Sequence, residues 1–157
     1  MTIAVGMDVS KAFFDAFVAV GKAGRHHQFP NSEKGVEALL LWCEKWKVTK
    51  PHFCMEATGS YSSKLAKALH QRDFQVSVVN PYCIRKFAQS KLRRTKTDKL
   101  DAKIIAEYCE SNQPRLWQPV PPEMEELQTL VRRLYDLTKM RTQELNRSAS
   151  NSFADST

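Results

Sequence analysis

Several residue types and patterns are scarce in this 157-residue chain. It has 5 Gly and 7 Pro, too few for a collagen-like or glycine-rich low-complexity protein. Its longest stretch without a charged side chain, residues 74–84, is far shorter than the ~20 residues that a membrane span needs. No charged-then-apolar leader opens the chain, so we expect no signal peptide, no membrane association and a cytoplasmic location.

Paired cysteine motifs are also missing. The four cysteines are far apart in the sequence and form no CxxC pair, which argues against a disulfide scaffold and against a zinc ribbon. The four histidines show no metal-ligand spacing, so we interpret them as surface or packing residues. Cys54 is most simply a small buried apolar side chain.

Positive charge is abundant and concentrated in one segment. The chain has 24 Lys and Arg against 17 Asp and Glu, a net charge of +7 and a pI near 9.3, which favours a polyanionic partner, most often nucleic acid. Residues 85–103 alone carry +6 of that charge. A solvated helix face and a nucleic-acid contact are equally good readings of such a run. The second reading assigns nucleic-acid binding to Arg85, Lys86, Lys91, Arg93, Arg94, Lys96 and Lys99.

The hydrophobic pattern predicts an α/β domain followed by a helical arm. Three short strands within residues 3–29 indicate an antiparallel meander, and helices then alternate with strands at 51–55 and 76–79. Four of the seven prolines lie between residues 114 and 122, which indicates a boundary. We therefore expect a domain at 1–113, a connector at 114–122, a helical arm at 123–147 and a disordered tail at 148–157. The arm has a coiled-coil-like seam, predicted to support oligomerisation, at Leu127, Leu130, Leu134 and Leu137.

Four acidic residues stand out by position. Asp8 interrupts an apolar strand, where a buried charge needs a partner or a metal, although a turn-capping role at the strand end is an equal alternative. Glu56 follows the apolar run 53–55 at a strand end, where ligands collect in α/β sheets, although an exposed glutamate is the simpler reading. Asp98 and Asp101 share one face if their segment is helical, and a divalent cation relieves their repulsion. Such oxygen ligands suit Mg²⁺ or Mn²⁺ and the two-metal chemistry of phosphodiester displacement.

Four motifs in this order resemble the amino-terminal domain of the DEDD-type transposases of bacterial insertion sequences, the group that includes the Piv invertases. They are Gly6-Met7-Asp8-Val9-Ser10-Lys11, Met55-Glu56-Ala57-Thr58-Gly59-Ser60-Tyr61, Val79-Asn80-Pro81 and Thr95-Lys96-Thr97-Asp98-Lys99-Leu100-Asp101-Ala102. The resemblance covers about residues 1–147. It implies a RuvC-like, ribonuclease-H-like fold, in which Asp8, Glu56, Asp98 and Asp101 are the catalytic carboxylates that bind Mg²⁺ or Mn²⁺.

The resemblance also implies partners and a missing part. Family members act on DNA and are thought to be guided by an RNA encoded in their own element. They are roughly twice as long as this chain, and their second domain supplies a serine thought to act as nucleophile. That domain is expected to be absent here, and the serines of the 148–157 tail do not replace it.

Three functions remain open from the sequence. The leading one is metal-dependent chemistry on phosphodiester bonds in DNA transposition. The second is a truncated binding module that holds DNA or RNA and associates with full-length transposase without catalysis. The third is a sugar- or acetate-kinase-like ATPase, which ranks low because only Gly59 follows Gly35 and further glycine-rich phosphate loops are missing.

Overall fold

The computed structural model describes residues 1–91 and 98–154, without the side chains of residues 98–100. It divides the chain into two compact units, residues 1–117 and 118–157. The first unit holds a mixed five-stranded sheet in the order β3-β2-β1-β4-β5. The strands are β1 (Ile3–Val9), β2 (Phe13–Val18), β3 (Arg25–Pro30), β4 (Pro51–Glu56) and β5 (Gln75–Val79).

Strand pairing follows from the connections between the strands. Short turns join β1, β2 and β3, so these pair antiparallel as the expected meander. Helices α1 (Glu33–Lys45) and α2 (Ser60–His70) separate β3, β4 and β5, and the longer crossovers make β4 parallel to both β1 and β5. β1 is therefore the central strand, with a neighbour on each side. Ser32 caps α1 as its position predicts, because its side chain accepts a hydrogen bond from the Gly35 N–H.

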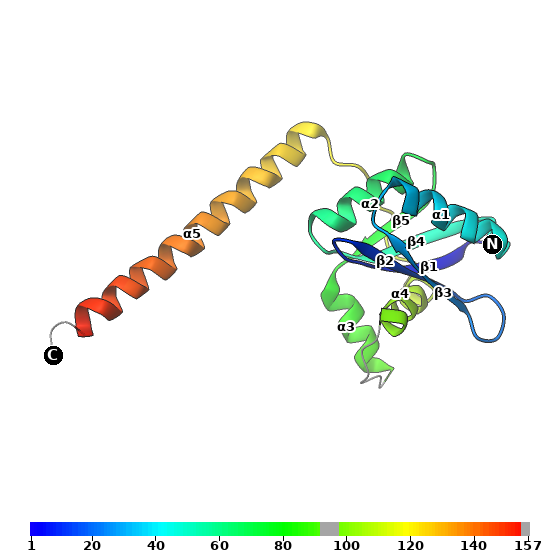
Figure 1. The fold of residues 1–157 in the computed structure, drawn as a ribbon, viewed down its shortest axis with the longest axis horizontal. Helices are drawn as coiled ribbons and strands as arrows, with labels where there is room; N and C mark the ends of the chain where they lie inside the picture. The colour runs from blue at the N-terminus through cyan, green and yellow to red at the C-terminus, as the bar shows by residue number, and fades with distance from the viewer. Residues whose placement is uncertain (92–97, 155–157) are drawn as a thin grey trace. The chain divides into compact units, whose positions relative to one another are not determined.

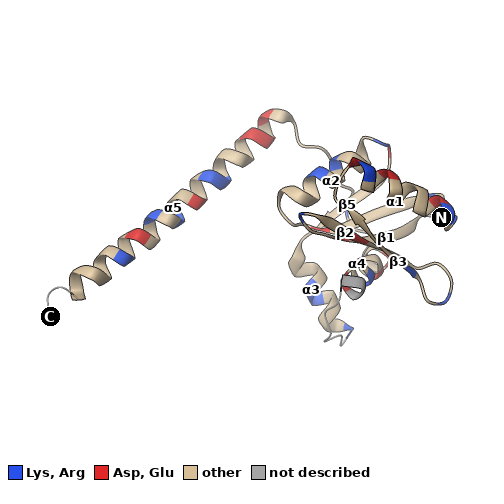
Figure 2. Ribbon diagram, in the orientation of Figure 1, with Lys and Arg blue, Asp and Glu red and all other residues tan. Residues whose placement is uncertain are grey.

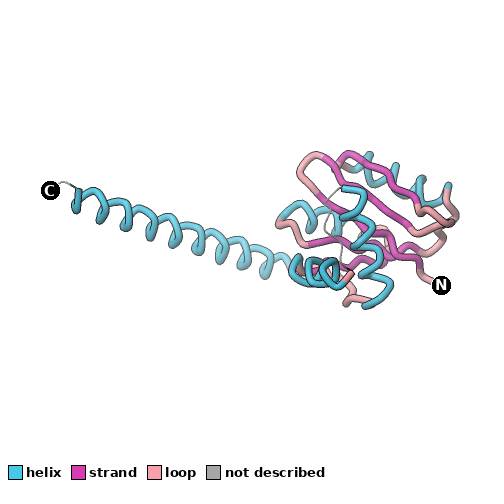
Figure 3. The backbone as a smooth tube through the Cα atoms, turned by 90° about the horizontal axis from the view of Figure 1, so that it is seen from below, coloured by secondary structure: helices cyan, strands magenta, loops and turns pink. Residues whose placement is uncertain are grey.

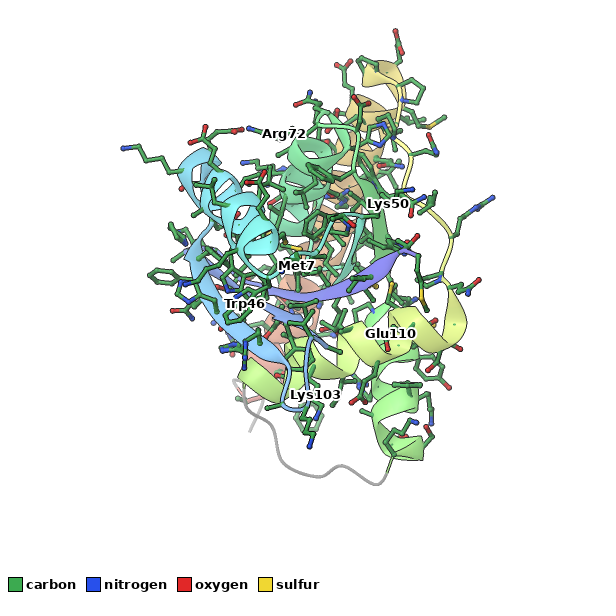
Figure 4. All side chains as sticks on the ribbon, turned by 90° about the vertical axis from the view of Figure 1, so that its right-hand side faces the viewer. Met7, Trp46, Lys50, Arg72, Lys103 and Glu110 are labelled. Atoms are coloured by element: carbon green, nitrogen blue, oxygen red, sulfur yellow. The ribbon has the colours of Figure 1, made fainter. Side chains whose placement is uncertain are left out.

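Each face of the sheet is covered by a different helix layer (Figure 1). Alternate residues of β1 such as Val5 and Met7 face α1 and α2 in the larger core, where Figure 4 shows Met7. The other residues of β1 face α3 (Pro81–Ser90) and α4 (Asp98–Asn112). In Figure 3 the strands lie next to one another in the sheet, and helices lie on both of its faces.

Gly6 explains how closely α4 approaches the sheet. A Cβ atom at Gly6 would collide with the backbone of Ala102 and of Ala106 in α4. Glycine therefore lets the helix backbone rest directly on the middle of β1, with the buried Ala102 and Ala106 keeping the contact short.

The boundaries differ from the sequence prediction at two places. The first unit extends past residue 113 to Trp117, because the Trp117 N–H donates to the Val76 carbonyl at 2.7 Å along the edge of β5. The tail expected to be disordered from residue 148 is helical as far as Ala154. The hydroxyls of Ser150 and Ser152 there donate to the carbonyls of Asn146 and Ala149 in the preceding turn.

The second unit contains α5 (Pro122–Ala154), in which no residue is buried. Lys and Arg alternate with Asp and Glu along its length (Figure 2). Its apolar side chains are exposed, including the four leucines of the expected seam at 127, 130, 134 and 137. Within the described ranges, none of the helices combines the length and apolarity that crossing a bilayer requires.

Candidate metal centre and nucleic-acid interface

The strands place Asp8 and Glu56 side by side. Met7 pairs with Met55 in the parallel ladder between β1 and β4, so the next residues, Asp8 and Glu56, follow at the same level. Neighbouring strands lie about 4.7–4.9 Å apart. Because side chains alternate along a strand, both acids lie on the face opposite Met7 and Met55, which is the face that α4 covers.

The direction of α4 places its first turn at the same end of the sheet. Ala102 lies against Gly6, whereas Cys109, two turns later, lies beside His52, which pairs with Ala4 near the start of β1. α4 therefore runs antiparallel to β1 and starts where β1 and β4 end. Asp98 and Asp101 belong to that first turn, so their backbone positions lie at the same corner of the sheet as the strand ends that bear Asp8 and Glu56. The side chain of Asp98 is outside the described residues.

A fifth acidic residue lies beside this corner, and sequence reasoning missed it. Asp15 of β2 pairs directly with Asp8 and shares its face of the sheet. Asp15 is 7% exposed, and its two carboxylate oxygens lie 3.0 Å from His26 Nε2 and 3.3 Å from Gln28 Nε2. The signal that singled out Asp8, an acid in an apolar strand, is also present in the Phe13–Val18 run.

The donor set of the corner fits a hard divalent cation. Asp8, Glu56, Asp98 and Asp101 offer only carboxylate oxygens, the ligands preferred by Mg²⁺ and Mn²⁺. The first turn of α4 adds the positive end of a helix dipole, which stabilises negative charge there. No three His, Cys, Asp or Glu side chains are already arranged around a metal position in the part of the chain that the structure describes.

Exposed cations lie on α3, which packs on α4 on the same face of the sheet. Arg85, Lys86 and Lys91 are exposed on or just after α3, and Figure 2 shows basic residues on this helix. α3 packs on α4 through an edge-on contact of the Phe87 and Tyr108 rings, whose centres are 5.5 Å apart. The remaining predicted contacts, Arg93, Arg94, Lys96 and the Lys99 side chain, are outside the described residues.

Comparison with known proteins gives a consistent assignment. Residues 5–151 match the family model DEDD_Tnp_IS110, described as a transposase. Two curated relatives, the pilin gene-inverting proteins of Moraxella bovis and Moraxella lacunata, are each 38% identical over 117 residues. That alignment covers 73% of this chain and 36% of each relative, so the chain spans about a third of their length.

A solved structure agrees at the level of the fold. The RuvC of T. thermophilus in complex with a Holliday junction substrate aligns with a TM-score of 0.51 at 9% identity. It covers 74% of this chain and 100% of the RuvC chain. This match confirms the RuvC-like, ribonuclease-H-like fold. The family-model match confirms the family resemblance that the four short motifs indicated. The chain belongs to the DEDD transposase family.

Proposed function

We propose that the first unit binds DNA and supports metal-dependent cleavage or transfer of phosphodiester bonds in DNA transposition. The observation that carries this proposal is the meeting of two strand ends, bearing Asp8 and Glu56, with the first turn of α4, bearing Asp98 and Asp101. Family membership supports DNA transposition or recombination as the process.

The four carboxylates are proposed to hold Mg²⁺ or Mn²⁺. When bound, such ions stabilise the attacking and leaving oxygens of a phosphodiester displacement. The chain's own contribution is to place four oxygen-donor side chains on rigid elements at one corner. Asp15 adds a further negative charge beside Asp8, and its hydrogen bonds to His26 and Gln28 fix its orientation.

The basic segment 85–103 is proposed to hold the DNA backbone next to that corner. The segment runs from α3 into the first turn of α4, so the chain itself connects its cations to the turn that bears Asp98 and Asp101. Lys and Arg contacts to phosphates give affinity and position without reading sequence. A guide RNA encoded in the mobile element is a further proposed partner, since its backbone presents the same phosphates.

A cleavage assay tests the proposal. The chain is incubated with branched and duplex DNA in Mg²⁺ or Mn²⁺, and we expect cleavage that chelator and Asp8→Asn both abolish. The matched control is Asp73→Asn, which removes one carboxylate at an exposed position away from the corner. Asn tolerates the positive φ of 61° at residue 73, so this substitution should leave the backbone conformation there unchanged. Equal cleavage by the parent and Asp8→Asn contradicts the metal proposal.

A second candidate is a binding module without catalysis. The observation that favours it is α5, whose leucine seam is exposed at all four positions and needs a partner to be buried. Such a chain holds DNA and associates with a full-length transposase through α5. DNA binding without cleavage in either metal, together with co-purification of the longer protein, distinguishes this function from the first.

A further inference from the structure

A second group of reactive side chains lies under the opposite end of α4. The hydroxyl oxygen of Ser77 is 2.9 Å from the Arg115 carbonyl oxygen and 3.2 Å from that of Pro114. A hydroxyl has one proton, so Ser77 donates it to these carbonyls and accepts a hydrogen bond from His52 Nε2 at 2.8 Å. The neutral His52 ring therefore carries its proton on Nε2, and Nδ1 is an acceptor.

The acceptor nitrogen of His52 faces a thiol. His52 Nδ1 is 3.5 Å from Cys109 Sγ. A base beside a thiol, held by a third group, is the arrangement that activates a cysteine nucleophile. The pKa of Cys109 is lowered to about 6, first by a hydrogen bond from the Cys54 thiol and then by His52, against the opposing effects of burial and of Glu110.

Cys54 is the direct neighbour of that thiolate. It lies on the same face of β4 as His52, fully buried, and its side chain is hydrogen-bonded to that of Cys109. Cys54 and Cys109 belong to the same buried cluster between β4 and α4, so the two sulfur atoms lie close together. A low-pKa thiol next to a second thiol is the pattern of an oxidant-sensitive cysteine with its resolving partner.

Small molecules have a route to Cys109. Cys109 is 2% exposed, but with His52 it lines a cavity of about 620 Å³ that also borders Thr2, Gln113 and Pro114. Figure 4 shows this end of α4, marked by Glu110, beneath β1. The cavity is large enough for hydrogen peroxide, which is little larger than water.

We propose that Cys109 is a peroxide-sensitive thiol that, with His52 as its base and Cys54 as its resolving partner, forms a disulfide between α4 and β4. The Cys109 thiolate attacks one peroxide oxygen, the O–O bond breaks, and the departing oxygen leaves as water after taking a proton. The resulting sulfenic acid reacts with the Cys54 thiol to give the disulfide and a second water. In total, two thiols lose two electrons and two protons to one peroxide.

The bond ties α4 to the strand that carries Glu56. It therefore fixes the same helix whose first turn bears Asp98 and Asp101, two turns away from the proposed metal centre. The proposal does not depend on metal chemistry at that centre.

Peptide mapping of the full chain tests the bond. After treatment with hydrogen peroxide in chelator, digestion without reductant should give a Cys54–Cys109 peptide that is lighter than its two thiol components by two hydrogen atoms. Dithiothreitol should restore the separate peptides. Absence of the bridge under excess peroxide, or a bridge through Cys43 or Cys83 in its place, overturns the proposal.

Variants test the roles of the three residues. Cys54→Ser should leave a sulfenic acid on Cys109 that dimedone traps. Cys43→Ala is the matched control, because burial raises the pKa of the Cys43 thiol to about 12, and this variant should form the bridge as the parent does. No dimedone adduct in Cys54→Ser, or loss of the bridge in Cys43→Ala, counts against the assignment.

His52→Asn separates activation by a base from simple proximity of the thiols. At pH 7 the rate of Cys109 alkylation by iodoacetamide should fall severalfold, because His52 is one of the two contacts that lower the pKa of Cys109 and its loss reduces the thiolate fraction. An unchanged rate and pH profile in a variant that melts like the parent refutes the role of His52. Peptide mapping of the parent chain shows whether the disulfide forms, so that test does not require the His52→Asn variant to fold.

Discussion

Asp15 and Ser77 are polar side chains inside the layer between the sheet and α4, and each is satisfied by hydrogen bonds. Asp15 receives them from two side chains of β3, and Ser77 uses two carbonyls and His52. A buried polar group without such partners costs more than its hydrogen bonds contribute. The α4 face of the sheet thus buries these two polar side chains among its apolar contacts, whereas the sheet residues under α1 and α2 are apolar.

Removing the Asp15 carboxylate should lower stability. Asp15→Ala takes the acceptor from His26 and Gln28, and we expect the free energy of unfolding to fall by about 1 to 2 kcal/mol, since both donors can turn to water. Asp15→Asn keeps one acceptor oxygen and should lose less. Urea denaturation measures both, with Glu37→Ala at an exposed position of α1 as the control. A loss in Asp15→Ala no larger than in Glu37→Ala contradicts the role of Asp15.

Residue patterns explain why part of the site was predictable. Asp8 and Glu56 interrupt or end apolar strands, so local sequence reveals them. Asp15 is also an acidic residue within an apolar strand, but the sequence analysis did not single it out. His52 and Cys109 are 57 positions apart, and nothing in either local sequence reports their contact. Only the packing of α4 on β4 brings them together.

At the level of elements, α4 connects the two sites. Its first turn bears Asp98 and Asp101, its far end bears Cys109, and its middle rests on Gly6 of β1. The strand order and the helix direction therefore determine where both sites lie. The sequence predicted most of these elements from their hydrophobic periods, but not the antiparallel path of α4 across β1, which depends on long-range packing.

A methyl group at Gly6 should lift α4 from the sheet. Gly6→Ala would meet backbone atoms of α4, which cannot rotate away as a side chain can, so we expect a loss of about 3 kcal/mol in unfolding free energy. Amide hydrogen exchange in α4 should speed up more than in α1. The control is Gly21→Asn, at a positive φ of 70° with open space around it. Equal stability of Gly6→Ala and this control contradicts the packing argument.

The exposed seam of α5 should cause self-association. Leucines spaced three and four apart form a stripe that a symmetric dimer buries, and we expect a dimer by sedimentation at micromolar concentration. Leu130→Glu with Leu134→Glu should give a monomer. The matched control, Gln128→Glu with Gln143→Glu, adds the same two negative charges off the seam and should remain dimeric. A parent chain that sediments as a monomer, or a control that also dissociates, argues against the seam.

At the scale of the whole molecule, charge is separated by region. Residues 85–103 hold +6 of the net +7, so the rest of the chain is nearly neutral. The α1 and α2 layer covers the other face of the sheet and carries scattered lysines of its own. DNA affinity should therefore depend on one segment rather than on total charge.

The salt dependence of DNA affinity shows whether binding depends on residues 85–103 or on the total charge of the chain. If the segment neutralises about five phosphates, DNA affinity should fall by about two to three orders of magnitude between 50 and 200 mM salt. Replacing Arg93, Arg94 and Lys96 by Ala should flatten that slope. The charge-matched control replaces Lys34, Lys64 and Lys67, exposed on α1 and α2, and should keep it. Equal slopes in the parent and the first triple variant place the contact elsewhere.

The docking of α4 on Gly6 has a consequence for the order in which the chain matures during synthesis. A ribosome makes β1 and β4 early, so a nascent chain holds Asp8 and Glu56 long before Asp98 and Asp101 exist. The proposed metal ligands can come together only after α4 has docked on β1, which is a long-range contact, and such contacts form slowly. A nascent chain that ends before α4 thus lacks two of the four proposed metal ligands, so we expect it to bind no metal at this corner.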